Sequence, residues 1–343
     1  MPRGLPLFRS ALGCAAALIL ATSPAASQST DNFYSGKTIT LTVGFTPGGG
    51  YDLFARLLAR HLGNHIPGKP TVVVRNMPGA ASLTSVLTLD TTAPADGTQI
   101  VTFNSGLLND TMAEGDKARV KFNSFAWLGS MTTDLRVCVT SKSSAIQSFD
   151  DLLKGKPAVC GAVGATSSSA ANIAMLRKLF NLSNLRMVTG YPGSAETHLA
   201  TERGEVDGVC TSWGGLPDAW VTGKTVNVLI RLSPGTVPEI PATAKYIGDL
   251  VSTAEQKTLV EVLVSSGELA RPFIMSKKVP AERLEILRKA FNETMTDKDL
   301  LAEAAKANLI IDAVDGPKAQ RITDQLYSLP ADVADKARAI LKD

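Results

Sequence analysis

Gly44-Phe45-Thr46-Pro47-Gly48-Gly49-Gly50-Tyr51-Asp52 joins a strand-like segment to a helix-like segment through three consecutive glycines. Residues 39–45 are typical of a strand, and residues 53–62 place four leucines and a phenylalanine on one side of a helix. Glycine lets main-chain N–H groups approach a ligand closely, and the N-terminus of a helix attracts negative charge. The stretch therefore predicts an anion-binding turn within an α/β fold.

The first 27 residues are typical of a secretory signal peptide. Arg3 and Arg9 precede the apolar run 11–21, and the small residues 23–27 follow it. The run is too short to anchor the chain in a bilayer. Removing residues 1–27 deletes two arginines and no acids, so the formal charge falls from +3 to +1. We expect an exported, periplasmic protein that does not bind nucleic acid.

The cysteines and histidines do not predict a metal site. Cys138, Cys160 and Cys210 all lie in apolar, strand-like runs, and the three histidines are scattered along the chain without ligand spacing. We expect buried thiols, although export leaves open one disulfide with one thiol left over. No metal and no cofactor is expected.

The length of the chain and the order of its elements predict two domains. About 315 residues remain after residue 27, which is more than one hydrophobic core usually supports. Strands are expected at 39–45, 71–75 and 98–103, and then at 137–140, 158–163, 186–189, 208–211 and 226–231, with helices at 149–153, 168–180 and 195–203 in the second series. Beyond the proline-rich segment 233–241, we expect helices at 253–268 and 280–309 and a strand at 271–276 that returns to the first sheet.

These elements predict an α/β protein in which each domain is a mainly parallel sheet flanked by helices. We expect residues 28–133 and 240–343 to form domain 1 and residues 134–239 to form domain 2. Ligands of open α/β sheets bind at the carboxyl ends of the strands. Four polar or glycine-rich turns follow predicted strands, at 47–52, 76–82, 164–169 and 191–195, two in each domain. We therefore expect the ligand in a cleft between the domains.

The order and spacing of six motifs resemble the periplasmic solute-binding receptors of tripartite tricarboxylate transporters, a Bug-type, TctC-like family. The motifs span 33–39, 45–56, 74–80, 94–98, 191–195 and 204–207, so the resemblance covers almost the whole exported chain. It implies a two-domain clamshell of the periplasmic-binding-protein type II kind, a Venus flytrap that captures a small carboxylate. It also implies a monomer that delivers the ligand to the membrane permease subunits of the transporter, without catalysis.

By resemblance, a carboxylate is held mainly by main-chain amides and water in the first two loops, and the Ser/Thr-rich and tyrosine loops of domain 2 close over it. Neutral donors at helix starts would bind the anion without a permanent buried countercharge. The expected ligand-binding residues are Pro47, Gly48, Gly49, Gly50, Tyr51, Asp52, Gly79, Ala80, Ala81, Ser82, Asn104, Thr166, Ser167, Ser168, Tyr191 and Asp207.

Several of these residues have a second interpretation. Asp52 either orients a ligand amine or caps the helix that follows, and Asp207 either contacts the ligand or belongs to a turn. Tyr191 either lines the pocket or packs beside Pro192. Tyr51 stands where the family has a smaller residue, so it would offer the ligand a hydroxyl group or a stacking face for an aromatic acid.

The sequence also bears on two other classes of protein, a secreted enzyme and a signalling receptor. A secreted α/β enzyme is disfavoured because the chain has neither a GxxxxGK[ST] loop nor a GxSxG elbow. A receptor that signals to a sensor kinase remains an alternative, because it requires the same ligand-driven closure. The sequence leaves open which carboxylate or amino acid is bound.

Overall fold

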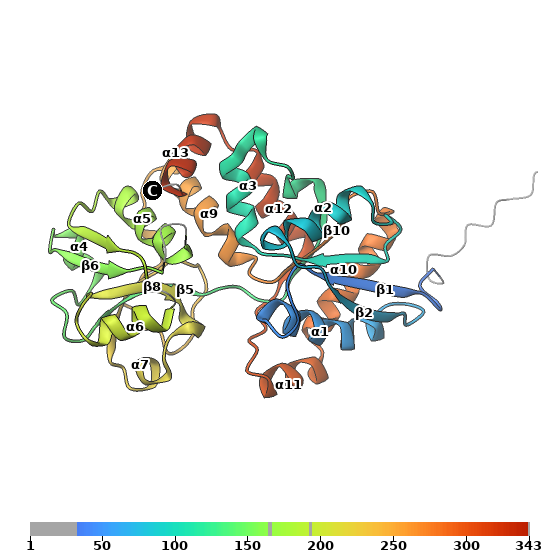
Figure 1. Cartoon of the computed structure of the whole chain (residues 1–343), viewed down its shortest axis with the longest axis horizontal. Helices are drawn as coiled ribbons and strands as arrows, with labels where there is room; N and C mark the ends of the chain where they lie inside the picture. The colour runs from blue at the N-terminus through green and yellow to red at the C-terminus, as the bar shows by residue number, and fades with distance from the viewer. Residues whose placement is uncertain (1–32, 164–166, 192–193, 342–343) are drawn as a thin grey trace, which may run out of the picture.

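The computed structural model describes residues 33–163, 167–191 and 194–341, which form two mixed β-sheets flanked by helices (Figure 1). The first domain is built from both ends of the chain, blue to cyan and orange to red, and the second from its middle, green to yellow. The expected signal peptide lies outside the described residues. Within the described residues, no helix combines the length and the apolar character needed to cross a membrane.

The first sheet has six strands in the order β11-β4-β10-β3-β1-β2. Strand β1 pairs in parallel with β2 and β3, whereas β10 pairs antiparallel with β3 and β4, and β11 pairs antiparallel with β4. The strands span β1 Thr38–Val43, β2 Thr71–Asn76, β3 Gln99–Thr102, β4 Phe125–Ser130, β10 Pro272–Ser276 and β11 Val314–Asp315.

The second sheet has five strands in the order β7-β6-β8-β5-β9. Strand β6 pairs in parallel with β7 and β8, while β5 pairs antiparallel with β8 and β9. The strands span β5 Arg136–Ser141, β6 Ala158–Gly161, β7 Leu185–Val188, β8 Gly208–Ser212 and β9 Val226–Arg231. The two-domain α/β fold is confirmed, but both sheets are mixed and not mainly parallel.

In domain 2 the three predicted helices are present as α4, α5 and α6, whereas α7 is not predicted, and the helices near the C-terminus differ from the prediction. They span α1 Gly50–Leu62, α2 Leu83–Thr91, α3 Gly106–Glu114, α4 Phe149–Leu153, α5 Ser168–Phe180, α6 Ser194–Glu202, α7 Asp218–Thr222, α8 Ile247–Leu250, α9 Ala254–Glu268, α10 Ala281–Met295, α11 Lys298–Lys306, α12 Gly316–Tyr327 and α13 Ala331–Leu341. Short 3-10 turns span Gly63–His65, Ala80–Ser82, Gly115–Lys117, Phe122–Ser124 and Trp213–Gly215. The single helix expected over 280–309 is two helices, because the Asp297 carboxylate accepts the N–H groups of Asp299 and Leu300 and starts α11 as its N-cap.

Alternating apolar residues bury both faces of the first sheet. In β4, Ala126 and Leu128 pack on the face covered by α1 and α10, while Phe125 and Trp127 pack on the opposite face. The cluster on that opposite face continues into domain 2. Its helical members come mainly from α3, α5, α9 and α13, and its strand members include Cys138 and Cys160 of the second sheet. We call this cluster the joint core.

Helix α13 is central to the joint core. It packs against α3 of domain 1, α5 of domain 2 and α9 between them (Figure 1). Its Ala337 is fully buried, and Val333 and Ile340 are each 6% exposed. The apolar interior is therefore shared between the domains on this side of the molecule.

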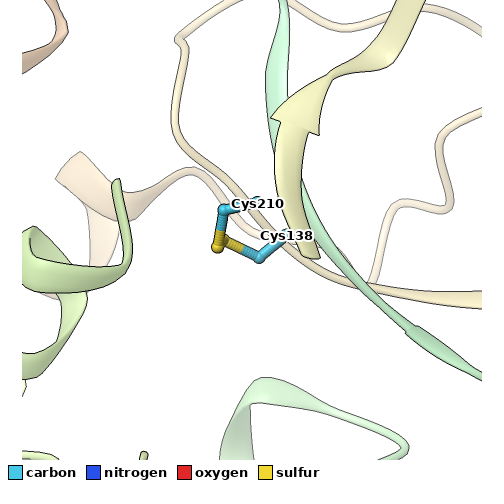
Figure 2. Close-up of a disulfide and its surroundings, with 2 residues drawn as sticks. All are labelled: Cys138 and Cys210. Carbon is cyan, nitrogen blue, oxygen red and sulfur yellow. A yellow bond between two sulfur atoms is a disulfide. The ribbon is translucent and has the colours of Figure 1, made fainter. Parts of the chain in front are cut away.

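Cys138 of β5 and Cys210 of β8 form a disulfide between adjacent antiparallel strands (Figure 2). The two residues are direct partners in the strand register, and their Cα atoms are 4.0 Å apart. Cys160 is a free, buried thiol, and burial together with the nearby Asp207 carboxylate raises its pKa to about 12. The expectation of buried thiols is therefore wrong for Cys138 and Cys210, and the structure realises the alternative of one disulfide with one thiol left over.

Candidate ligand-binding site

A cavity of about 720 Å³ lies between the two domains. Domain 1 lines it from the first turn of α1, from the loops after β2 and β3, from α3 and α9, and from the residues before β10. Domain 2 lines it from the start of β5 and from α5. The residues that line it include Tyr51, Ala80, Ala81, Asn104, Gly106, Asn109, Asp110, Glu114, Asp134, Arg136, Ser167, Ser168, Asn172, Ser266 and Arg271.

Helix N-termini from both domains meet at this cavity. Tyr51 belongs to the first turn of α1, Gly106 is the first residue of α3, and Ser168 is the first residue of α5. Ala80 and Ala81 form the turn that leads into α2. The first N–H groups of a helix have no partner within the helix and carry a partial positive charge. The lining therefore suits an anionic ligand.

The Asp52 carboxylate organises the glycine loop. It accepts the N–H of Gly48 at 2.8 Å, a bond from Arg56 at 2.8 Å and a bond from Asn76 at 2.8 Å, and the Asn76 amide also donates to the Phe45 carbonyl at 2.9 Å. Burial alone would raise the pKa of Asp52, but these hydrogen bonds, with that from Arg56 the strongest, lower it to about 2. Asp52 thus stabilises the glycine loop through hydrogen bonds within domain 1. The only main-chain N–H group that it is seen to accept among the described residues, that of Gly48, lies before α1 and not in its first turn.

The second loop has an unusual backbone. Ala80, Ala81 and Ser82 have φ values of 45°, 51° and 78°, in the left-handed region that side-chain-bearing residues rarely occupy. Ser82 is fully buried, and its Oγ accepts the N–H of Asn104 at 2.7 Å. Gly44 is required beneath this loop, because a Cβ at position 44 would lie 2.1 Å from the Cβ of Ser82. The loops after β1, β2 and β3 are therefore fitted to one another.

Tyr51 is held on both faces and at its hydroxyl group. Phe45 stacks on the ring at a centroid distance of 4.6 Å, and the Arg271 guanidinium lies over the ring at 4.5 Å. The Tyr51 hydroxyl accepts the N–H of Ser105 at 3.1 Å. In this arrangement neither face of the ring is open to an aromatic ligand, and the residue links α1 to the start of α3.

Arg271 is one of the cavity residues that the sequence does not predict, as are Asn109, Asp110, Arg136, Asn172 and Ser266. The predicted strand 271–276 is confirmed as β10, which begins at Pro272 and pairs antiparallel with β3. Because β10 is antiparallel, its first residues lie at the sheet edge where the parallel strands end. Knowledge of this strand direction would have placed Arg271 at the ligand-binding edge of the sheet. The expected donors were mainly main-chain amides, and the cavity lining adds a guanidinium to them.

Other charged residues of the cavity are paired or gathered elsewhere. Arg136 is neutralised by Asp134, whose Oδ2 lies 2.8 Å from its Nε. Asp110 and Glu114 lie one turn apart on α3, and burial, with the Glu114 charge adding to it, raises the pKa of Asp110. Among the described residues, Arg271 near α1 and Arg119 after α3 line the cavity without an ion pair, and negative charge lies on α3.

Two amide side chains complete the cavity wall. Asn109 donates to Ser266 Oγ at 3.1 Å, while its buried Oδ1 has no partner in the described part of the chain. Asn172 of α5 is 7% exposed, and its side-chain amide forms no hydrogen bond within the described residues. The two amides can pair with polar atoms of a ligand from both domains.

Six of the residues expected to bind the ligand line the cavity, namely Tyr51, Ala80, Ala81, Asn104, Ser167 and Ser168. Thr166 lies outside the described residues. The remaining nine do not line it in this structure, namely Pro47, Gly48, Gly49, Gly50, Asp52, Gly79, Ser82, Tyr191 and Asp207. Seven of these nine residues belong to the loops after β1 and β2 or to the first turn of α1.

Tyr191 and Asp207 have structural contacts away from the cavity. The Tyr191 ring packs closely on Gly161, since a Cβ added there would lie 3.3 Å from it. Asp207 accepts the hydroxyl of Ser144 and the N–H of Val159, each at 2.8 Å. It precedes β8, which runs parallel to β6, so it lies at the edge where those strands begin, opposite the loop that leads to α5.

Among the residues that the structure describes, no three His, Cys, Asp or Glu side chains gather in a way that could hold a metal ion.

Sequence comparison and structural comparison give different results. No family model matches the sequence, and no curated protein matches it either. The fold, however, is similar to that of a TctC solute-binding protein from Polaromonas, with a TM-score of 0.70 and 16% identity over 90% of this chain and 98% of that one.

Two further solved structures with this fold contain a ligand. MatC from Rhodopseudomonas palustris, with bound malate, has a TM-score of 0.52 and 16% identity over 89% of this chain and 99% of that one. A second R. palustris protein, with adipate, has a TM-score of 0.52 and 17% identity over 88% of this chain and 97% of that one. The chain therefore has the two-domain α/β fold of the TctC-type periplasmic solute-binding proteins.

Proposed function

We propose that the protein is a periplasmic solute-binding protein that captures a small organic acid for a tripartite tricarboxylate-type transporter. The observation that carries this proposal is the convergence of helix N-termini from both domains on one cavity. Such N-termini attract carboxylates by their partial positive charge and bind them with those first N–H groups that have no other partner. In α3 the first N–H, that of Gly106, already donates to Asn104 Oδ1. Because the two walls belong to different domains, an anion that contacts both would favour closure.

The relatives support a carboxylate as the ligand. Two proteins with the same fold were solved with malate and adipate, which are both small dicarboxylates. A cavity of about 720 Å³ holds an acid of that size together with water. The motifs of the sequence resemble the same family of receptors.

We further propose that the mature protein is an exported monomer, released from its signal peptide near residue 27, and that its partners are the membrane permease subunits of the transporter. In this proposal, residues 28–133 and 240–343 form domain 1, and residues 134–239 form domain 2. The proposed role is binding without catalysis.

A receptor for a sensor kinase would use the same cavity. Deletion of the permease genes separates transport from signalling, because only transport requires the permease.

A thermal-shift screen tests the binding function. Purified protein lacking residues 1–27 is heated with acetate, succinate, malate, adipate, citrate and benzoate, and with glucose as a neutral control. At least one acid should raise the melting temperature, because a ligand that binds only the folded state stabilises it by mass action. A shift with glucose and none with any acid would refute the proposal.

Substitution in the glycine loop provides a second readout. A Cβ at Gly49 meets no atom within 4 Å, so Gly49→Val is accommodated by the fold while its side chain screens the N-terminus of α1. We expect weaker binding of the best acid by isothermal titration calorimetry. Gly214→Val is the matched control, because Gly214 has equally open surroundings but lies in the turn Trp213–Gly215 and not at the N-terminus of α1.

A further inference from the structure

The main chain of Arg271 is fixed at the sheet edge that faces the cavity. Its N–H donates to Ser130 Oγ at 3.0 Å, and its carbonyl accepts the N–H of Met131 at 3.1 Å. Pro272, which follows, restricts the conformation of Arg271 to the extended region. The side chain therefore leaves a rigid strand end and enters the cavity between the domains.

The guanidinium group lies against the first turn of α1. Its Cζ is 4.5 Å from the centre of the Tyr51 ring and 5.3 Å from that of Phe54. A Cβ added to Gly50 would lie only 3.2 Å from Nη2, which places this nitrogen beside the first residue of the helix. The cation and the helix N-terminus therefore attract an anion to the same place.

Aromatic stacking holds the guanidinium in position. Tyr51 is itself fixed by Phe45 on its other face and by the Ser105 N–H at its hydroxyl group. Stacking leaves the edge of a guanidinium group free to donate hydrogen bonds. Within the described chain, Nη1 donates to the Ala270 carbonyl at 2.7 Å, and no other donor of the group has a hydrogen-bond partner.

Arg271 also has no carboxylate partner among the described residues, unlike Arg56 of α1 and Arg136 of β5. Arg56 is paired with Asp52, and Arg136 is paired with Asp134. A half-buried guanidinium without a counterion is costly unless a ligand supplies the negative charge.

We propose that Arg271, held by Tyr51, binds the carboxylate of the ligand directly at the start of α1. This proposal rests on the proposed function and makes it more specific: a guanidinium–carboxylate pair, and not main-chain amides alone, sets the affinity. It assigns Tyr51 the role of positioning Arg271. It also selects an ionised acid over its amide or ester, because only the acid neutralises the cation.

Calorimetric titration of variants tests the proposal, with the acid from the six-member panel that shifts the melting temperature most as the probe. Arg271→Gln should weaken binding about 10- to 100-fold, the usual effect of losing a hydrogen bond between charged groups. Arg271→Lys keeps the charge and loses the planar fork, so it should lie between Arg271→Gln and the wild type. Raising the salt concentration should weaken binding to the wild type more than to Arg271→Gln.

Arg283 offers a matched control. Its guanidinium also stacks on an aromatic ring, that of Phe33 at 3.5 Å, and its buried Nε also lacks a partner, but it does not line the cavity. Arg283→Gln should therefore bind the probe as the wild type does. Comparing the two variants separates the loss of stacking and burial from the loss of a ligand contact.

The outcomes distinguish this proposal from the function on which it rests. If the wild type binds an acid and Arg271→Gln binds it within twofold, the role of Arg271 is refuted and the receptor function stands. If Arg283→Gln loses as much affinity as Arg271→Gln, the role of Arg271 is likewise refuted and the receptor function stands. If the wild type binds none of the six acids, both proposals fail. Should Arg271→Gln fold poorly, the neutral amide of the same acid decides. A wild type that binds this amide within twofold of the acid would also exclude a direct pair with the carboxylate.

Discussion

Asp52 has more structural consequence than a helix cap would have. It ties the glycine loop to α1 and, through Asn76, to the end of β2, so one carboxylate fixes the turn that faces the cavity. From the sequence, an acidic residue at a helix start suggests a cap. The partners that define its role come from positions 4 residues before it and 24 residues after it, and only the folded chain brings them together.

Replacing Asp52 by asparagine should destabilise the protein by about 2 kcal/mol at pH 7. The pKa of the folded carboxyl group is about 2, below its ordinary value of 3.8, so the stabilisation is fully present above pH 4 and is lost as the pH falls towards 2. Urea denaturation at pH 7 and at pH 2.5 measures this effect. The difference between wild type and variant should shrink at the lower pH, and a difference that stays constant would show that the charge is not its source.

Tyr51 and Arg271 show what the sequence can and cannot supply at this scale. Tyr51 is predicted at the site because it lies beside the glycines that define the turn. Arg271 is 220 residues further along the chain, by their numbering, and no local motif marks it. Its place depends on the antiparallel direction of β10, which follows from the pairing of strands and not from their hydrophobic pattern.

Among the secondary-structure elements, those with strong periodicity and clear ends are predicted best. Helices α4 and α5 and strand β9 have the bounds that the sequence predicts. Strand β4 was not predicted, because its residues are buried on both faces and show no alternation of polar and apolar side chains. Helices α12 and α13 were also not predicted.

The disulfide between β5 and β8 should contribute substantially to stability. It closes a loop with a sequence separation of 72 residues, and the entropy removed from an unfolded chain by such a loop corresponds to about 4 kcal/mol. We therefore expect the double substitution Cys138→Ala with Cys210→Ala to lower the free energy of unfolding by about that amount in chemical denaturation.

The third cysteine provides the control for this experiment. Cys160 lies in the same core with a free thiol, so Cys160→Ala removes a sulfur atom without opening a loop. Its loss should be about 1 kcal/mol. Equal losses in the two variants would mean that packing, and not the cross-link, accounts for the effect.

At the scale of the whole molecule, the joint core makes the two domains one thermodynamic unit. Apolar residues of α3, α5, α9 and α13 form one continuous cluster that reaches both sheets. The sequence predicts two domains from length and alternation, but it does not predict this shared interior, which depends on where the C-terminal helices return.

Differential scanning calorimetry should therefore show a single unfolding transition for the ligand-free protein. The calorimetric and van't Hoff enthalpies should agree, as in cooperative two-state unfolding. Ala337→Asp, which would bury a charge in α13, should lower the temperature of that transition and leave it single. Two separate transitions in the wild type would show that the domains unfold independently.

The order of the elements along the chain has a consequence for how the protein is made. Helix α13, residues 331–341, follows α3, α5 and α9 in the sequence and packs against all three. A nascent chain that has already made those three helices therefore lacks one wall of the joint core until α13 leaves the ribosome.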